Sequence, residues 1–353
     1  MKNVNQFFRK NLFSLVLTSI VLGFLLGWQL PQTSALLKPL IVPVLFLMIF
    51  VMIIPIEFRE LIAVRKYKKE IFWGFIAILI LAPLVAYLVS FAVPEKYDFL
   101  KTGLILAATM PPGGMIVSWA GLLDANVELA MILQTGTFVL ALVTIPLTLS
   151  LFLSGSVHFS QSLLIQNIAL YIFLPLIAGF IVQVLLKKKY SKEKIKSWKP
   201  TLATISSLCA LLVVFISTSL KANTIISHPQ VLLWGLLLAV VYYLVMFLIT
   251  LFFSGLFIGS YDNQMPIVYG TTSKNLSIGV ALALSAFSGP VVLGVVFCFM
   301  VQMPMLSLFY KFIKKEEQEF AEEVAEEKKK RHSASVILRK IRKVGNNFYK
   351  LDQ

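Results

Sequence analysis

Lys274 is the residue of this sequence whose type and position most strongly suggest chemistry. It lies inside a long apolar stretch, about residues 264–287, in which every other side chain is uncharged. At about 1.5 Å per residue it lies roughly 15 Å beyond the start of that stretch. A charge at that depth of a bilayer costs at least about 2.5–3.5 kcal/mol unless it is paired or faces water. Three roles stay open: Lys274 meets an anionic solute, is an uncharged amine, or is a structural cation held by helix carbonyls.

Neutral polar side chains accompany this lysine in the sequence. Thr272 and Ser273 precede it and Asn275 follows it, and side chains of this kind suit a small cation or a polar solute. We expect the ion-coupling residues to be Thr109, Ser118, Gln134, Thr135, Asn275 and Gln302. Taken singly, such a residue more often packs one helix against another.

A second interruption, TMPPGGM at residues 109–115, lies in the apolar stretch of about residues 104–123. Its prolines remove backbone donors and its glycines allow conformations closed to other residues, so we expect this helix to unwind near its middle. A matching break is expected at Gly270 and the hydroxyl run of residues 271–273. The alternative is a kink that serves packing alone. The expected solute-binding residues are Pro112, Gly113, Gly114, Met115, Thr272, Ser273, Lys274 and Asn275.

The composition indicates which elements must position these residues. Of 353 residues, 58% are hydrophobic and 14% are charged, with a mean hydropathy of +0.85, which is typical of a multi-pass membrane protein. Ten apolar stretches are long enough to cross a bilayer. They lie at about residues 12–30, 36–56, 70–93, 102–123, 127–154, 162–186, 200–220, 230–258, 264–287 and 290–313.

The ten stretches divide into two sets of five. We expect an inverted repeat of residues 1–155 and 156–314, followed by a charged cytoplasmic tail, 315–353. Short likenesses support this division, such as IVLGF with LIAGF and IPLTLSLF with MPMLSLF. The fold class is then an all-α membrane protein with ten transmembrane helices in an inverted five-plus-five repeat. Its discontinuous helices four and nine cross at the midplane, which is the arrangement of a secondary transporter's binding site.

The basic residues predict the orientation. Most of the 32 lysines and arginines lie in the N-terminal head, after the second stretch, at residues 187–199 and beyond residue 310. Basic loops stay in the cytoplasm, so we expect both termini there, in the plasma (inner) membrane. The net charge of +15 is explained by this topology and by anionic lipid, without a nucleic-acid partner. The closing segment HSASVILRKIRKV is either a basic amphipathic helix on the membrane or a solvated tail.

Other chemistries lack their signatures in the sequence. Cys209 and Cys298 match no metal or disulfide spacing, and the three histidines lie in loops or the tail. There is no G-x-x-x-x-G-K-[ST] phosphate loop and no H-E-x-x-H pair. We therefore expect neither an enzyme nor a bound cofactor, apart from Na+ or H+ as a coupling ion. The partners expected are a small-molecule solute and the lipid bilayer, with the oligomeric state left open.

The two interrupted segments resemble the bile acid:sodium symporter superfamily, which includes the arsenite efflux permeases. The resemblance rests on PPGGMIVSW (residues 111–119), VYGTTSKNLSIGVALALSAF (268–287) and VQMPM (301–305). Pro112 and the paired glycines match the motif that opens the sodium-binding crossover in the bile acid branch, whereas Met115 and Trp119 suit the arsenite branch.

The sequence departs from this family pattern at two places. The arsenite permeases carry a cysteine thiolate where this chain has Pro112, and members of both branches carry a carboxylate where Asn275 stands. The resemblance implies a secondary active transporter of a small, anionic organic solute, coupled to Na+ or H+ and working by alternating access. If Lys274 takes the place of the cation, because the carboxylate is missing, the protein would be an anion uniporter or a lysine-based proton-coupled carrier. The alternative is efflux of arsenite or another metalloid oxyanion.

Overall fold

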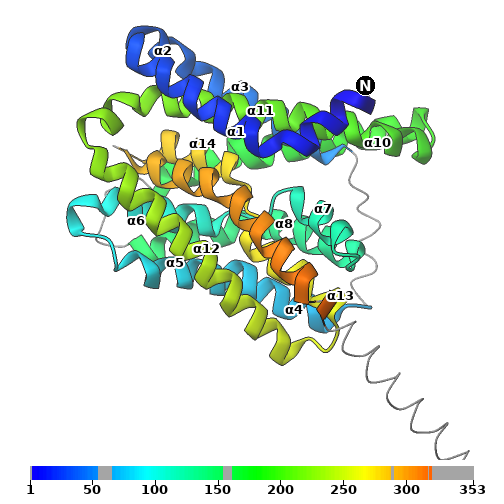
Figure 1. Cartoon of the computed structure of the whole chain (residues 1–353). Coiled ribbons are helices and arrows are strands. Elements are labelled where there is room, and N and C mark those ends of the chain that lie inside the picture. Colours follow the sequence, from blue (N-terminus) through cyan, green and yellow to red (C-terminus); the bar gives the residue numbers. More distant parts are fainter. Residues whose placement is uncertain (1, 55–65, 154–160, 288–289, 317, 320–353) are drawn as a thin grey trace, which may run out of the picture. The chain divides into compact units, whose positions relative to one another are not determined.

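A computed structural model describes the chain except for residues 1, 55–65, 154–160, 288–289, 317 and 320–353. The chain forms two compact units, Met1–Leu306 and Ser307–Gln353. The closing segment HSASVILRKIRKV lies outside the described residues. Within the described part the elements are all helical, with no β-strand, which confirms the expected all-α class (Figure 1).

The helices of the first part of the chain follow the apolar stretches. Their bounds are α1 Lys2–Gln29, α2 Pro31–Leu37, α3 Ile41–Ile53, α4 Lys68–Ile76, α5 Ala82–Ser90, α6 Asp98–Thr109, α7 Met115–Leu122 and α8 Val127–Leu153. A π-helical turn, Ala77–Leu81, joins α4 to α5 in one continuous helical segment. The wider turn changes the hydrogen-bond register of this segment, and this matters for the site below.

The second part of the chain continues in the same way. It contains α9 Gln161–Ile168, α10 Leu174–Lys189, α11 Lys192–Ser227, α12 Pro229–Phe257, α13 Tyr261–Thr272 and α14 Leu276–Ala286, and then a further helix, Val291–Glu316. A second π-helical turn, Ala169–Phe173, joins α9 to α10.

Several of these helices are apolar and long enough to cross a membrane. Five qualify on length and composition within the described residues: Pro31–Ile53, Lys68–Ser90, Glu193–Ser227, Pro229–Phe257 and Val291–Glu316. A sixth span results if the pair Val127–Ala141 and Val143–Leu153, bent by 67°, is counted as one. The chain is therefore a multi-pass membrane protein, and the exact number of spans stays a prediction.

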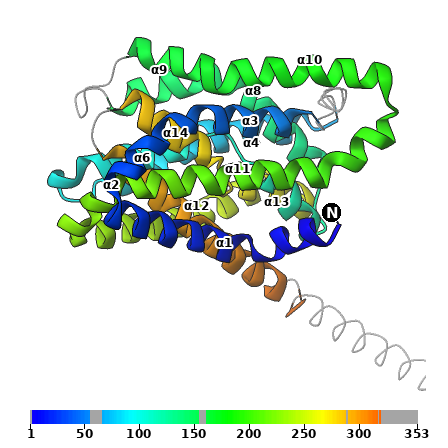
Figure 2. The same ribbon diagram turned by 90° about the horizontal axis from the view of Figure 1, so that it is seen from above.

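A first helix group consists of α1, α3, α10 and α11, which pack along one another (Figure 2). Small residues bring these helices close together. A Cβ atom at Gly23 or Gly27 of α1 would overlap the carbonyl oxygen of Phe215 or Ser219 on α11. Close backbone approach at glycine is typical of helix pairs in membranes, where dispersion contacts drive association.

A second helix group consists of α4 to α8, α12 and α13. The helix Val291–Glu316 packs against α6 at another pair of glycines, because a Cβ at Gly103 would lie 2.7 Å from the Cα of Gly294. Phe299 and Met300, which follow on that helix, pack against an apolar cluster on α1 and α11. α14 contacts α6 on one side and α3, α9 and α11 on the other. These two elements therefore connect the helix groups.

Candidate functional site

Two short non-helical segments pair with each other in the centre of the first compact unit. Residues 110–114 separate α6 from α7, and residues 273–275 separate α13 from α14. They form an antiparallel bridge between Pro112 and Lys274. The Gly113 N–H donates to the Ser273 carbonyl at 2.8 Å, and the Asn275 N–H donates to the Pro111 carbonyl at 2.9 Å. Backbone groups that leave helical pairing are thus satisfied across the break, as a buried site requires. We call these residues the paired segments.

The local sequence explains why α6 stops. The residues after Met110 are prolines, which cannot donate the N–H that a continuing helix needs, so Met110 turns to an extended conformation (ψ 144°). Gly113 then lies against the other segment, where a Cβ would meet the Lys274 carbonyl at 3.7 Å. Helix α7 begins at Met115 with no proline in its path.

The second break begins later than the sequence predicted. Gly270 lies within α13, which continues to Thr272, so the expectation that Gly270 opens the break is wrong. Its small size serves packing instead, since a Cβ would lie 2.9 Å from Ile78 Cδ1 and 3.1 Å from Ile116 Cδ1. The hydroxyls of Thr271 and Thr272 donate to the Val268 carbonyl, at 2.8 and 2.9 Å. Such bonds are compatible with a helix and do not end it.

Lys274 lies at the centre of the paired segments and is 1% exposed. Its amine donates to the Ile78 carbonyl at 3.0 Å. Its backbone N–H donates to Gln302 Oε1 at 3.0 Å, and its carbonyl accepts from Gln302 Nε2 at 3.2 Å. Tyr243 donates its hydroxyl to the same Oε1 at 3.0 Å. Both the side chain and the backbone of Lys274 are therefore fixed.

The Ile78 carbonyl is available to Lys274 because of the π-helical turn. In this turn the Ala82 N–H donates to the Ala77 carbonyl, five residues back. The same register assigns the Ile78 carbonyl to residue 83, which is a proline and has no N–H. A carbonyl without a helix partner then accepts from the amine. Sequence reasoning missed Ile78, and Pro83 was the only signal that pointed to it.

This contact is compatible with a structural cation held by a helix carbonyl and equally with an uncharged amine, because both forms of the amine donate to a carbonyl. Lys274 takes part in no ion pair with a carboxylate within the described residues.

The other predicted solute-binding residues lie around this pair of segments in different environments. Ser273 is fully buried, and its hydroxyl has no hydrogen-bond partner within the described part of the chain. Asn275 is 9% exposed. Gly114 is exposed and Met115 is half-buried, so the start of α7 is the accessible edge of the site.

The predicted ion-coupling residues are only partly brought together. Gln302 contacts Lys274 directly, and Gln134 of α8 lies near Gly114, where a Cβ would be 3.7 Å from its Nε2. Thr109 is buried, but its hydroxyl donates within its own helix, to Leu106 at 2.7 Å. Within the described residues no hydrogen bond joins Ser118 or Thr135 to the paired segments.

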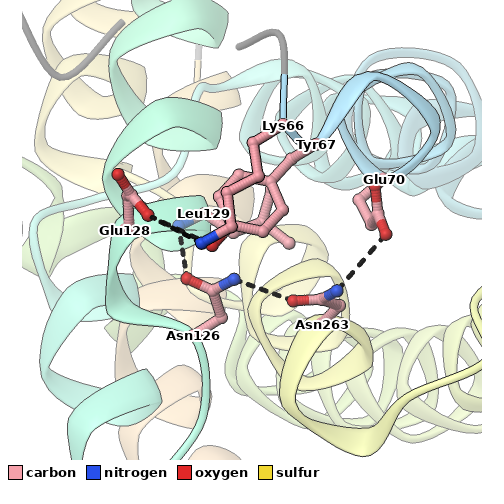
Figure 3. Close-up of polar contacts among 7 residues, drawn as sticks. All are labelled: Lys66, Tyr67, Glu70, Asn126, Glu128, Leu129 and Asn263. Atoms are coloured by element: carbon pink, nitrogen blue, oxygen red, sulfur yellow. Dashed lines mark hydrogen bonds and ion pairs between the residues drawn. The ribbon is translucent and has the colours of Figure 1, made fainter. Parts of the chain in front are cut away.

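A polar cluster ties together the N-terminal ends of α4, α8 and α13 (Figure 3). Asn126 donates to Asn263 Oδ1 at 2.8 Å, and Asn263 donates to Glu70 Oε1 at 3.3 Å. Asn126 also caps α8, since its Oδ1 accepts from the Leu129 N–H at 2.9 Å. We call Glu70, Asn126 and Asn263 the amide relay.

Beside the amide relay, Tyr67 donates its hydroxyl to Glu128 Oε2 at 3.1 Å. Lys66 lies 4.0 Å from the same oxygen, and this pair is largely exposed, so it adds little to stability. Glu70 and Glu128 lie in the first turns of α4 and α8, where a negative charge interacts favourably with the helix dipole. Sequence reasoning did not identify the two asparagines, Asn126 and Asn263, that connect Glu70 to the N-terminal end of α8.

Comparison with known proteins assigns this sequence to a protein family. The model of the sodium bile acid symporter family matches residues 42–228, more than half of the chain. The chain belongs to this family. The match includes the first of the paired segments and ends before the second.

Among its relatives, the uncharacterized protein YbaS of Bacillus subtilis is 24% identical over 305 residues, which cover 83% of this chain and 93% of that protein. The uncharacterized sodium-dependent transporter YocS of the same organism is 26% identical, over 76% of this chain and 81% of that protein. Sodium/bile acid cotransporter 7 of Xenopus tropicalis is 27% identical, over 62% of this chain and 60% of that protein. As a member of the sodium bile acid symporter family, the chain is a membrane transporter and not an enzyme.

Proposed function

We propose that this chain is a secondary active transporter of a small organic anion, working by alternating access, with its solute bound at the paired segments. The observation that carries the proposal is the mutual pairing of residues 110–114 and 273–275. It brings four helix ends to one place, and broken helices of this kind form the binding sites of many secondary transporters. Membership of a transporter family supports the same conclusion.

The proposal includes a topology of ten spans in an inverted five-plus-five repeat. The pairs α6 with α7 and α13 with α14 are then the discontinuous fourth and ninth helices, crossing at the midplane. The amide relay and three basic residues at or just before the start of α4 (Lys66, Lys68 and Lys69) lie at the same end of the first unit, which supports a cytoplasmic assignment for that end. Both termini would be cytoplasmic, in the plasma membrane.

An anionic solute is favoured by the polar groups in and beside the paired segments. The first N–H groups of α7 and α14 have no partners within their own helices, and helix N-termini attract negative charge. Ser273 adds a buried hydroxyl that has no partner among the described residues, and the protonated form of Lys274 adds a positive charge to the field around the site. The coupling ion at this stage is either Na+ or H+.

Uptake by proteoliposomes tests the proposal. Sodium and pH gradients are imposed separately, and the panel of solutes contains carboxylates, sulfonates and arsenite. We expect uptake of at least one carboxylate or sulfonate against its gradient. Uptake of arsenite alone would favour metalloid transport, and the failure of every solute under every gradient would contradict the proposal.

A pair of glycine variants tests the place of the site. Gly114→Leu fills the accessible edge, where a Cβ meets only Gln134 within 4 Å, so the protein should fold and lose uptake by at least about tenfold. Gly255→Leu is the matched control, since nothing lies within 4 Å of a Cβ there. Equal uptake by the two variants would place the solute elsewhere.

A further inference from the structure

The amine of Lys274 is held where the protein offers a ligand for a cation. The Ile78 carbonyl lacks a helix partner because Pro83 follows five residues later in the π-helical turn. Backbone carbonyls freed from helical pairing are the oxygen ligands that hard monovalent and divalent cations take in proteins. In this structure the oxygen is already bound to Lys274 Nζ, at 3.0 Å.

The surroundings allow little adjustment of this amine. The Gln302 side-chain amide bonds both the backbone N–H and the backbone carbonyl of Lys274. The Tyr243 hydroxyl donates to Gln302 Oε1 and so orients this amide. Because Gly270 has no side chain, α13 packs closely against Ile78 of the π-helical turn. This close packing brings the Lys274 amine within hydrogen-bond distance of the Ile78 carbonyl. The amine therefore connects the second paired segment to the segment that joins α4 and α5.

The charges around Lys274 disfavour a sodium ion bound next to its amine. Within the described residues Lys274 pairs with no carboxylate, and its neighbours Thr272, Ser273 and Asn275 are neutral. A sodium ion would compete with the Lys274 amine for the Ile78 carbonyl, and beside the protonated amine it would also meet a like charge in a buried environment, where like charges repel strongly.

We infer that the Lys274 amine is a built-in replacement for a coupling sodium ion, so that this transporter closes around its solute without binding sodium at the paired segments. The inference rests on the proposed function and narrows it: the coupling ion is then not sodium. It also sets this chain apart from relatives whose names describe them as sodium-dependent or sodium cotransporters.

Thermal unfolding of the purified protein tests the inference independently of transport. Tryptophan fluorescence is a suitable signal, because Trp119 stacks on Tyr269 of α13 at 5.3 Å between ring centres. A ligand that binds the folded state raises the unfolding midpoint in a saturable way. We expect the midpoint in sodium chloride to equal that in choline chloride of the same ionic strength, within about 1 °C. A saturable rise with sodium would overturn the inference.

Two lysine variants measure what the amine contributes. Lys274→Met keeps an unbranched side chain one atom shorter and leaves the Ile78 carbonyl without its donor, so we expect a lower midpoint than in the matched variant Lys101→Met. Lys101 lies in the first turns of α6, paired with Asp98 at 2.8 Å, and not at the paired segments. Equal midpoints would overturn the inference. If Lys274→Met does not fold, the sodium comparison on the unchanged protein still decides.

Uptake experiments separate this inference from the proposed function. Uptake that proceeds equally in sodium and choline supports both, whereas uptake that requires an inward sodium gradient overturns the inference and leaves the proposed function intact. Absence of uptake for every solute counts against the proposed function, and the unfolding comparison then still tests the sodium question.

Discussion

At the scale of single residues, the site depends on which backbone groups lack helical partners. Sequence reasoning identified Lys274 and the Pro-Gly segment because a charge and two prolines are conspicuous in an apolar stretch. It could not identify Ile78, because an apolar residue in an apolar run carries no signal of its own. Pro83 removes the donor for its carbonyl only in the π-helical register, and that register is set by packing rather than by local sequence.

Ser273→Ala is the sharpest change at this scale. The hydroxyl is fully buried without a partner in the described residues, and such a group costs about 1–3 kcal/mol, so removing it should leave stability unchanged or raise it. Uptake should fall if this hydroxyl binds the solute, as proposed. Unfolding midpoints and initial uptake rates measure the two effects.

Thr218→Val is the control for Ser273→Ala, because the buried Thr218 hydroxyl donates within its own helix, to the Val214 carbonyl, away from the paired segments. It should change uptake little. A clear loss of stability in Ser273→Ala would show that the hydroxyl has a structural partner in the protein.

At the scale of elements, the candidate site lies where α6 and α13 end. The sequence predicted the end of α6 more accurately than the end of α13. The end of α6 was predicted because proline stops a helix for a local reason. The end of α13 was misplaced by a few residues, because Gly270 has the same local signature whether it opens a break or admits Ile78 and Ile116. Only the neighbouring helices distinguish the two uses of glycine.

The amide relay gives a prediction for the ends of α8 and α13. Asn126→Ala removes the cap of α8 and the bond to Asn263, so we expect a loss of about 1 kcal/mol from the cap and a further loss from the bond. Asn263→Ala keeps the cap of α8 and removes the bonds of Asn263 to Asn126 and to Glu70. Unfolding of the two single variants and the double variant gives the coupling energy.

A coupling energy above about 0.5 kcal/mol is expected for residues in direct contact. Strict additivity of the two changes would mean that Asn126 and Asn263 do not interact in the folded protein.

At the scale of the whole molecule, the first compact unit has polar ties at two ends. The amide relay closes one end, and Tyr97 closes another by donating to Gln230 Oε1 at 2.8 Å. The amide relay lies next to the basic residues Lys66, Lys68 and Lys69, whereas the stretch around Tyr97 has two lysines, Lys96 and Lys101. Hydropathy predicted where helices lie along the sequence. It could not show which helices form each group, because an apolar face does not specify which other helix it packs against.

Thiol labelling tests the proposed orientation. Glu95 and Lys66 are both exposed, at loops on either side of the α4–α5 segment. In intact cells a membrane-impermeant maleimide should label Glu95→Cys, and it should label Lys66→Cys only after the membrane is opened. The native Cys209 and Cys298 are buried, so background labelling should be low. The opposite pattern would reverse the orientation.

The pairing of the two broken segments also bears on how the protein is made. The Pro111 carbonyl and the Gly113 N–H leave the ribosome before α8, α9, α10, α11, α12 and α13, whereas their partners at residues 273 and 275 follow all of these helices. Until then the nascent chain carries unsatisfied peptide groups within an apolar segment, which lipid does not tolerate. The first half must therefore keep these groups in contact with water or the insertion machinery until residues 273–275 have been made, so the paired segments form late in biogenesis.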